Sequence, residues 1–312
     1  MIRECHGDLH LGNVFYHESE FILFDRIEFS ESLRWIDTMS DVAFMVMDMS
    51  DKGLASYANR LLNCYLEYTG DYAGLQVLEF YFVYRALVRA KICLLESVQV
   101  GSAKESKQQS LKGFKHYLQL ADSHAEKRDL FLGITHGVSG SGKSTLGRCL
   151  AEELGAIQIR SDVERKRLFG LGRLDRSCTS GTDIYTSDAS NRTFARLASL
   201  ARTVLRAGFG VIVDAVFFER SRREMFSNLG QQLDVSCVLF DCLADEKTIL
   251  NRLELRRKAG SDPSEAALPQ YLSQLQHQEP LSTSELARTI QVDTTQCIDV
   301  VMIGKRLNAL ME

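Results

Sequence analysis

A glycine-rich run with a single lysine carries the clearest chemical signal in this chain. Residues 137–145 read Gly-Val-Ser-Gly-Ser-Gly-Lys-Ser-Thr, which fits the pattern G-x-x-x-x-G-K-S/T. Glycines leave space for successive backbone N–H groups to point at a phosphate group, and the lysine ammonium can then contact the β- and γ-phosphates. A hydroxyl directly after the lysine completes a Mg²⁺ site. We therefore expect this run to bind ATP with Mg²⁺.

The segments on either side of this run support the same interpretation. The apolar residues 130–135 predict a strand before it, and the segment from Ser144 predicts a helix whose positive end faces the anion. The alternative is a glycine-rich turn that binds no nucleotide, which requires neither flanking element. The expected ATP-binding residues are Gly137, Val138, Ser139, Gly140, Ser141, Gly142, Lys143, Ser144 and Thr145, with Ser144 also on Mg²⁺.

Asp214 closes a short apolar strand that begins at Val211. In a phosphate-binding protein of this kind, a carboxylate at the end of a strand is expected on the Mg²⁺ side of the triphosphate. An aspartate at a strand end also suits a turn or a helix cap. Because the phosphate-binding run precedes it, we expect Asp214 to contribute to the Mg²⁺ site.

Asp162 follows the predicted strand 156–160, at the sheet edge where ligands bind in open α/β folds. A carboxylate there could accept the proton of an attacking hydroxyl, as carboxylates do in phosphoryl transfer. The alternative is that Ser161 or Asp162 only caps a helix beginning at Val163. We expect Asp162 to be a general base.

Two arginines, Arg252 and Arg256, lie four positions apart near the end of the predicted helix 245–258, and Arg257 follows them. The next residues, Ala-Gly-Ser-Asp-Pro-Ser-Glu, are typical of a mobile turn. Guanidinium groups on a closing flap could neutralise charge on the transferring phosphoryl group. Arginines in a last helical turn also complement the helix dipole. We expect Arg252 and Arg256 to act from a lid, and we leave Arg257 open.

These motifs resemble those of the adenylate-kinase-like phosphate-loop kinases, especially the group with polynucleotide kinase, gluconate kinase and zeta-toxin-type sugar-nucleotide kinases. The similarity spans about residues 130 to 312. It implies ATP at Lys143 and Ser144, Asp162 as the base toward a substrate hydroxyl, and Arg165 three residues later helping to hold substrate. It also implies lid arginines near 252 to 257. The resemblance does not identify the acceptor.

The first half carries a second candidate site. A His-Gly-Asp run ends at Asp8, Asn13 lies five residues later, and Asp25 ends the apolar run that starts at Phe21. In this spacing Asp8 can take a hydroxyl proton, while Asn13 turns back toward Mg²⁺ and Asp25 supplies a second metal carboxylate. A polar turn without catalytic function is the alternative.

This run resembles the H-x-D-x-x-x-x-N catalytic loop of aminoglycoside-phosphotransferase-like enzymes, in which Trp35, Asp37 and Asp41 fit the helical segment that follows. Those enzymes need an N-terminal lobe over ATP, but this chain begins five residues before His6. We therefore expect either a fragment of a longer protein or a late start, with Asp8 vestigial or dependent on the missing lobe. The arrangement resembles a bacterial fusion of such a domain with a phosphate-loop kinase.

Hydrophobic periodicity divides the chain in two, with expected domains at 1–126 and 127–312. The first is mainly helical after a short hairpin, and alternating strands and helices in the second predict an α/β fold with a parallel sheet covered by helices on both faces. The expected hairpin pairs 13–16 with 21–25, helices cover 36–49, 54–68, 75–95 and 111–124, and 99–110 is a loop. In the second domain, strands are expected at 130–136, 156–160, 210–214 and 235–242, and helices at 143–154, 163–169, 188–207, 219–232 and 245–258.

Composition is that of an ordinary soluble protein, with 45% hydrophobic and 25% charged residues among 312. Eight scattered cysteines without a C-x-x-C pair favour free thiols and a cytoplasmic location. Charged residues interrupt the most apolar predicted helix, so we expect no membrane span. A formal net charge of −4 argues against a broad nucleic-acid-binding surface, although a local basic groove stays open.

Taken together, these features favour an ATP-dependent phosphotransferase whose active centre lies in the second half. Because Asp162 is offered as a base, the acceptor is expected to be a hydroxyl of a small molecule or nucleotide. One alternative is ATP hydrolysis at the same site without transfer. Another is a nucleotide-binding module that regulates a partner, with both sites catalytically idle.

Overall fold

A computed structural model describes residues 1–98, 104–124, 129–177, 184–259, 262–265 and 268–311. The chain divides into two compact units. Unit 1 comprises Met1–Leu62 and Ala73–Arg128, and unit 2 comprises Asn63–Tyr72 and Asp129–Glu312. The expected domain boundary between residues 126 and 127 lies outside the described residues.

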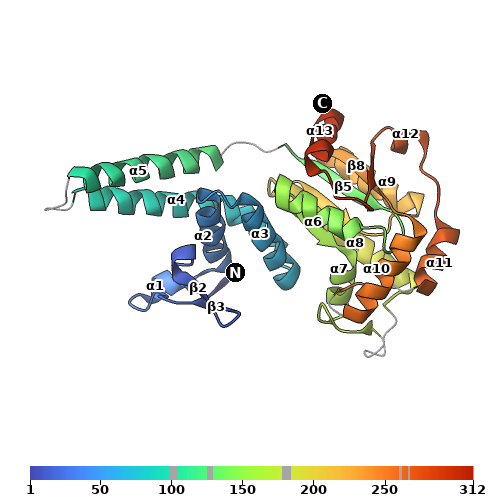
Figure 1. Cartoon of the computed structure of the whole chain (residues 1–312), viewed down its shortest axis with the longest axis horizontal. Helices are drawn as coiled ribbons and strands as arrows, with labels where there is room; N and C mark the ends of the chain where they lie inside the picture. Colours follow the sequence, from blue (N-terminus) through green and yellow to red (C-terminus); the bar gives the residue numbers. More distant parts are fainter. Residues whose placement is uncertain (99–103, 125–128, 178–183, 260–261, 266–267, 312) are drawn as a thin grey trace. The chain divides into compact units, whose positions relative to one another are not determined.

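Unit 2 is built on a parallel sheet, as the sequence predicted, but the sheet has five strands where four were expected (Figure 1). Its strands lie in the order β6-β7-β5-β8-β9, so β5 is central. The apolar composition of β5 follows from this position, because all six of its residues are buried. The strands are β5 (Phe131–His136), β6 (Ile157–Arg160), β7 (Val211–Asp214), β8 (Ser236–Leu243) and β9 (Thr289–Asp293).

Helices cover the sheet of unit 2. Leu146 of α6 and Ile303 of α13 belong to one apolar cluster with Phe131, Ile212 and Phe240 of the sheet. Helices α8 and α9 contact each other as well as the central strands, and together they form the second layer. The helices are α6 (Lys143–Leu154), α7 (Ser161–Leu168), α8 (Ser187–Arg206), α9 (Arg220–Leu233), α10 (Glu246–Ala259), α11 (Leu268–His277), α12 (Thr283–Leu286) and α13 (Val300–Met311).

Unit 1 is mainly helical, with two small antiparallel sheets at its start. Strand β1 (Ile2–Glu4) pairs with β4 (Trp35–Asp37), and β2 (Val14–His17) pairs with β3 (Glu20–Leu23) in the expected hairpin. Unit 1 also contains the short helix α1 (Glu31–Arg34) and two short 3-10 turns. The turns are η1 (Leu11–Asn13) and η2 (Tyr72–Gly74), and residue 72 of η2 belongs to unit 2. The longer helices are α2 (Thr38–Asp51), α3 (Ala55–Thr69, whose residues from Asn63 onward belong to unit 2), α4 (Leu75–Val98) and α5 (Lys104–His124).

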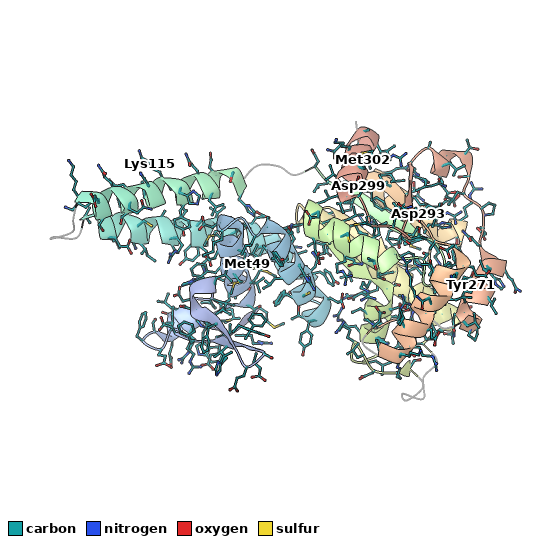
Figure 2. All side chains as sticks on the ribbon, in the orientation of Figure 1. Met49, Lys115, Tyr271, Asp293, Asp299 and Met302 are labelled. Atoms are coloured by element: carbon teal, nitrogen blue, oxygen red, sulfur yellow. The ribbon has the colours of Figure 1, made fainter. Side chains whose placement is uncertain are left out.

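Two sequence predictions for unit 1 were wrong. Residues 104–110, expected in a loop, form the first two turns of α5, while 99–103 lie outside the described residues. The segment is polar and lies at the surface of α5, like Lys115 (Figure 2), so its hydrophobic pattern does not show the helix. Trp35 and Asp37, expected in a helix, lie in β4, and only Asp41 is helical. None of the helices in the described part of the chain is both long and apolar enough to cross a bilayer.

Candidate active site

The glycine-rich run forms the turn between β5 and α6. Gly137 and Gly142 adopt positive φ angles of 126° and 91°. A Cβ atom on Gly137 would lie 2.6 Å from the carbonyl oxygen of Cys242, and one on Gly142 would lie 2.7 Å from Oγ1 of Thr294. Both contacts are too short for a side chain, so these two positions require glycine. Helix α6 begins at Lys143, which places its N-terminus at the end of the turn.

Lys143 is buried beneath this turn. Its Nζ donates hydrogen bonds to the carbonyl oxygens of Gly137 (2.9 Å) and Val138 (2.8 Å). Burial lowers the pKa of Lys143, while the nearby charge of Asp214 raises it. The Ser141 hydroxyl is also buried and has no hydrogen-bond partner among the described residues. An ammonium and an unpaired hydroxyl in one turn fit a phosphate group.

Three other residues of the run, Ser139, Gly140 and Thr145, lie in different environments. The backbone N–H of Ser139 donates to Oε1 of Gln274 on α11 at 2.7 Å. Gly140 is buried, and its carbonyl oxygen accepts from Arg252 at 3.2 Å. Thr145 is exposed on the first turn of α6. The run is therefore held from outside by side chains of other elements.

Asp214 lies at the end of β7, directly beside β5, and is buried. Burial raises its pKa, while the charge of Arg160 and a hydrogen bond from Ser144 lower it. Gln158 Nε2 donates to Oδ2 of Asp214 (3.2 Å) and to the carbonyl oxygen of Ser144 (3.2 Å). The expected Mg²⁺ pair, Ser144 and Asp214, is thus brought together by the structure.

A Mg²⁺ ion needs few ligands from this chain. The described residues contain no group of three or more His, Cys, Asp or Glu that could hold a metal. Mg²⁺ in phosphate-binding proteins takes one or two protein ligands and fills its other positions with water and substrate phosphates. One hydroxyl and one carboxylate, from Ser144 and Asp214, fit that requirement.

Asp162 lies in the first turn of α7, half-buried. The helix begins at Ser161, and the N-cap position is occupied by Arg160, so the capping role that we considered for Ser161 or Asp162 is not present. Asp162 makes no hydrogen bond or ion pair with the described residues. Its charge acts on both Lys143 and Asp214, which places its carboxylate on the phosphate side of the sheet.

The two expected lid arginines have different surroundings. Arg252 donates from Nη1 to Oγ1 of Thr294 (3.0 Å) and from Nη2 to the Thr294 carbonyl oxygen. Thr294 Oγ1 in turn lies 2.7 Å from the carbonyl oxygen of Ser141, so Arg252 contacts the outside of the phosphate-binding turn. Arg256, one helical turn later, is half-buried, and its charge lowers the pKa of Lys143 behind the larger effect of burial. Of these two arginines, Arg256 is thus the one whose charge acts on Lys143.

The expected flap is held by acidic residues where the structure describes it. Asp262 accepts from Nη2 of Arg160 at 3.1 Å, and Glu265 lies 3.1 Å from Nζ of Lys166. Arg160 also lies 3.6 Å from Oδ2 of Asp214, so it joins this segment to the expected Mg²⁺ ligand. Sequence reasoning missed Arg160. Its position at the end of β6, directly before Asp162, was the available signal.

The second candidate site, in unit 1, is also assembled. Asn13 donates from Nδ2 to the carbonyl oxygen of Asp8 (3.0 Å) and to its Oδ2 (3.2 Å). Asp8 and Asp25 line one open cavity of about 1110 Å³. The backbone N–H groups of His6 and Gly7 donate to the Asp41 carboxylate at 2.7 and 3.1 Å, which fixes the loop that carries Asp8.

Arg85 of α4 supports this loop from below. It donates to the carbonyl oxygen of Gly7 at 2.9 Å and lies 3.6 Å from Oδ1 of Asp41. Burial lowers the pKa of Arg85, and the Asp41 carboxylate raises it. We expected no role for Arg85 in this site, because no local catalytic pattern surrounds it in the predicted helix 75–95.

Comparison with known proteins finds a matching family model within unit 2. Residues 132–281 match the family model described as "AAA domain". An uncharacterised protein of Mycobacterium tuberculosis is 29% identical over 262 residues, which cover 84% of this chain and 51% of the relative. The chain thus spans about half the length of the curated relatives it matches.

Two kinases are similar among solved structures. A gluconokinase from Sinorhizobium meliloti 1021 aligns at 21% identity and a TM-score of 0.40, covering 59% of this chain and 93% of that protein. An APS kinase of Mycobacterium tuberculosis, solved in complex with AMPPNP and APS, aligns at 18% identity and a TM-score of 0.38. That alignment covers 59% of this chain and 98% of the APS kinase.

Proposed function

We propose that unit 2 is an ATP-dependent kinase that transfers the γ-phosphoryl group to a hydroxyl of a small molecule or nucleotide. The observation that carries this proposal is the arrangement at the carboxyl ends of β5, β7 and β6. A buried lysine, a hydroxyl–carboxylate pair and a half-buried aspartate without a hydrogen-bond partner among the described residues follow these three adjacent strands. Phosphoryl transfer to a hydroxyl uses a site that binds the phosphates, a metal site and a base.

Each residue has a distinct task in this reaction. Lys143 and the backbone N–H groups of residues 137–145 bind the phosphates, with Ser141 as a further donor. Ser144 and Asp214 would hold Mg²⁺, which neutralises charge on the β- and γ-phosphates when bound. Arg256 adds positive charge on the same side, and Arg252 keeps the phosphate-binding turn in place through Thr294.

Asp162 accepts the proton of the acceptor hydroxyl as its oxygen attacks the γ-phosphorus. The bond from phosphorus to the β–γ bridging oxygen breaks, and ADP leaves. Asp162 suits this task because no described residue forms a hydrogen bond with its carboxylate, and it lies half-buried in the first turn of α7. If the protein only bound ATP and regulated a partner, without turning ATP over, this carboxylate would have no role.

For unit 1 we propose an aminoglycoside-phosphotransferase-like domain in which Asp8, Asn13 and Asp25 keep the positions of a catalytic loop. The hydrogen bonds from His6 and Gly7 to Asp41 support it, because they hold this loop in place. We infer that Asp8 takes no part in the transfer that we propose for unit 2.

The kinase proposal is tested by Lys143→Ala in the full chain. ATP with Mg²⁺ should raise the melting temperature of the wild type, because a ligand that binds only the folded state stabilises it. The variant should lose most of this shift, since a charge next to the β/γ-phosphates is removed. The reaction itself is then measured as the transfer of ³²P from ATP into mixtures of hydroxyl-bearing metabolites and nucleotides. An unchanged shift in Lys143→Ala would contradict the nucleotide site, and ATP consumption independent of any acceptor would favour hydrolysis.

A further inference from the structure

Two arginines from different helices meet near the start of α8. Arg165 of α7 donates from Nη1 to the carbonyl oxygen of Ile184 (2.9 Å) and to Oγ of Ser190 (3.3 Å). Arg222 of α9 donates from Nη2 to the side-chain oxygen of Asn191. Ser190 and Asn191 are adjacent, so both guanidinium groups contact the first turn of α8. Burial lowers the pKa of Arg165, and the like charge of Arg222 adds to this effect.

Neither guanidinium group uses all of its donors. The Nε atoms of Arg165 and Arg222 are buried, and neither donates a hydrogen bond to a residue that the structure describes. Arg222 Nε does lie 3.3 Å from Oε2 of Glu219, but this carboxylate is mostly exposed to solvent. Buried N–H groups without an acceptor are rare in folded proteins. Two of them on adjacent arginines indicate that a ligand provides acceptors here.

Aromatic rings fix the planes of both groups. The guanidinium carbon of Arg165 lies 5.2 Å from the ring centre of Tyr185, and that of Arg222 lies 4.7 Å from the ring centre of Phe194. A guanidinium that is stacked on a ring keeps its N–H edges free for a planar or tetrahedral oxyanion. The arginines are thus already oriented, so little side-chain freedom is lost when an anion binds.

This pair of arginines lies beside the proposed base. Arg165 follows Asp162 by three positions, which places both on one face of α7. Burial and the charge of Asp162 raise the pKa of Tyr185, so its phenol stays protonated next to the same carboxylate. The residues around the acceptor position therefore combine one base with two fixed positive charges.

We propose that Arg165 and Arg222 together bind an anionic group of the acceptor, so that the substrate is a hydroxy compound bearing a carboxylate or a phosphate. The inference rests on the proposed kinase function, because it concerns the acceptor side of the same site. An anion held by both arginines fixes the acceptor at one end and presents its hydroxyl to Asp162 at the other. A neutral acceptor would leave the buried Nε–H groups of both arginines without a hydrogen-bond acceptor, which disfavours that class.

The test is binding of three related compounds to the full chain with the nucleotide site filled by AMP-PNP and Mg²⁺. Glycerol carries only hydroxyl groups, glycerate adds a carboxylate, and glycerol 3-phosphate adds a phosphate. Isothermal titration should show that at least one of the two anions binds and that glycerol does not. Preference between the two distinguishes a carboxylate from a phosphate. Equal behaviour of all three compounds, or no binding by any of them, would overturn the proposal.

The variants separate the arginine pair from general charge effects. Arg222→Gln should weaken anion binding by roughly 10- to 100-fold, because a hydrogen bond to a charged group is lost. Arg222→Lys keeps the charge but loses the second donor edge, so its loss should be smaller. Arg220→Gln is the matched control, since Arg220 lies on the same helix but pairs with Glu224 at the surface. If Arg222→Gln, with an unchanged melting temperature, binds anions as the wild type does, the proposal is wrong.

The same titrations show whether the kinase proposal fails, separately from the proposal on the arginine pair. If AMP-PNP does not bind the wild type, the proposed nucleotide site is contradicted. Titration with inorganic phosphate without nucleotide then tests the arginine pair alone. Binding that persists in Lys143→Ala and is lost in Arg222→Gln would support the pair, and binding that is lost only in Lys143→Ala would exclude it.

Discussion

At the scale of single residues, Asp162 separates the competing functions most sharply. Asp162→Asn keeps the shape of the side chain and removes the proton acceptor. We expect phosphoryl transfer to fall about 10²- to 10⁴-fold, the usual contribution of a positioned base, while ATP affinity stays close to that of the wild type. Transfer rate, ATP affinity and melting temperature should be measured on the same preparations.

The position of Asp162 in α7 makes this measurement easier to interpret than we expected from the sequence. Because the N-cap position belongs to Arg160, replacing Asp162 does not remove a helix cap, and the melting temperature should hardly change. Near wild-type transfer by Asp162→Asn would exclude the base and favour hydrolysis or a switch.

The sequence predicted where the phosphate-binding turn lies, between a strand and a helix, but not the residues that support it. Glycines, lysine and hydroxyl form a local pattern, so residues 137–145 could be recognised without a structure. Arg160, Arg222 and Thr294 contribute through contacts with residues far along the chain, and no local pattern marks such partners. The hydrogen bond from Arg252 to the carbonyl oxygen of Gly140 could not be predicted for the same reason. The packing of α10, and not the local sequence, determines where this side chain lies.

At the scale of elements, the turn between β5 and α6 tolerates no side chain at its last glycine. Gly142→Ala should abolish the ATP-dependent melting shift and destabilise the protein by about 1–3 kcal/mol, because it combines a positive φ with a clash against Thr294. Gly208→Ala is the control, with a φ of 86° and no atom within 4 Å of the new Cβ. It should lower the melting temperature slightly and leave the ATP shift intact. Equal behaviour of the two variants would show that the clash is unimportant.

An internal ion pair joins α9 to α12 and makes stability depend on pH. Glu285 accepts from Nε of Arg223 at 2.6 Å and from the backbone N–H of Ser282 at 2.8 Å. Burial alone would raise the pKa of Glu285, but these hydrogen bonds lower it to about 2 from 4.5. The folded state thus binds the proton less readily than the unfolded state. The stabilisation is complete above pH 4.5 and is lost as pH falls toward 2.

Glu285→Ala should therefore destabilise the protein by about 3–5 kcal/mol at neutral pH, because Arg223 is left buried without its partner. Urea unfolding at pH 7 and at pH 3 measures this difference, which should shrink at the lower pH. Glu254→Gln on the surface of α10 serves as comparison and should change little at either pH. A pH-independent effect of Glu285→Ala would show that packing, rather than charge, holds α12.

Elements with strong periodicity were predicted within one to two residues, as for α6, whose predicted bounds agree with the structure. Strand β9 was missed although its residues Thr289–Asp293 alternate between buried and exposed, a pattern that favours an edge strand but extends over only five residues here. The start of α5 was missed because polar helices bury little and depend on the neighbouring α4 for their position.

At the scale of the whole molecule, the two candidate sites should contribute very unequally. Asp8→Asn in the full chain should leave ATP-dependent transfer unchanged, since the phosphate-binding turn and the proposed base both belong to unit 2. Lys143→Ala should remove the same activity. Parallel ³²P transfer assays on the two variants check this. Transfer that depends on Asp8 would assign catalysis to unit 1 and contradict our proposal.

The order of strands in unit 2 has a consequence for synthesis on the ribosome. Strand β5 is the first of the sheet to be made, yet its two neighbours, β7 and β8, begin only at Val211 and Ser236. At translation rates of about 5–20 residues per second, β5 waits roughly 4–15 s for its first partner. During that interval a strand that is fully buried in the folded protein, and the phosphate-binding turn that follows it, have no sheet to join. Newly made chains therefore pass through a period in which aggregation competes with folding, and the nucleotide can bind only after it ends.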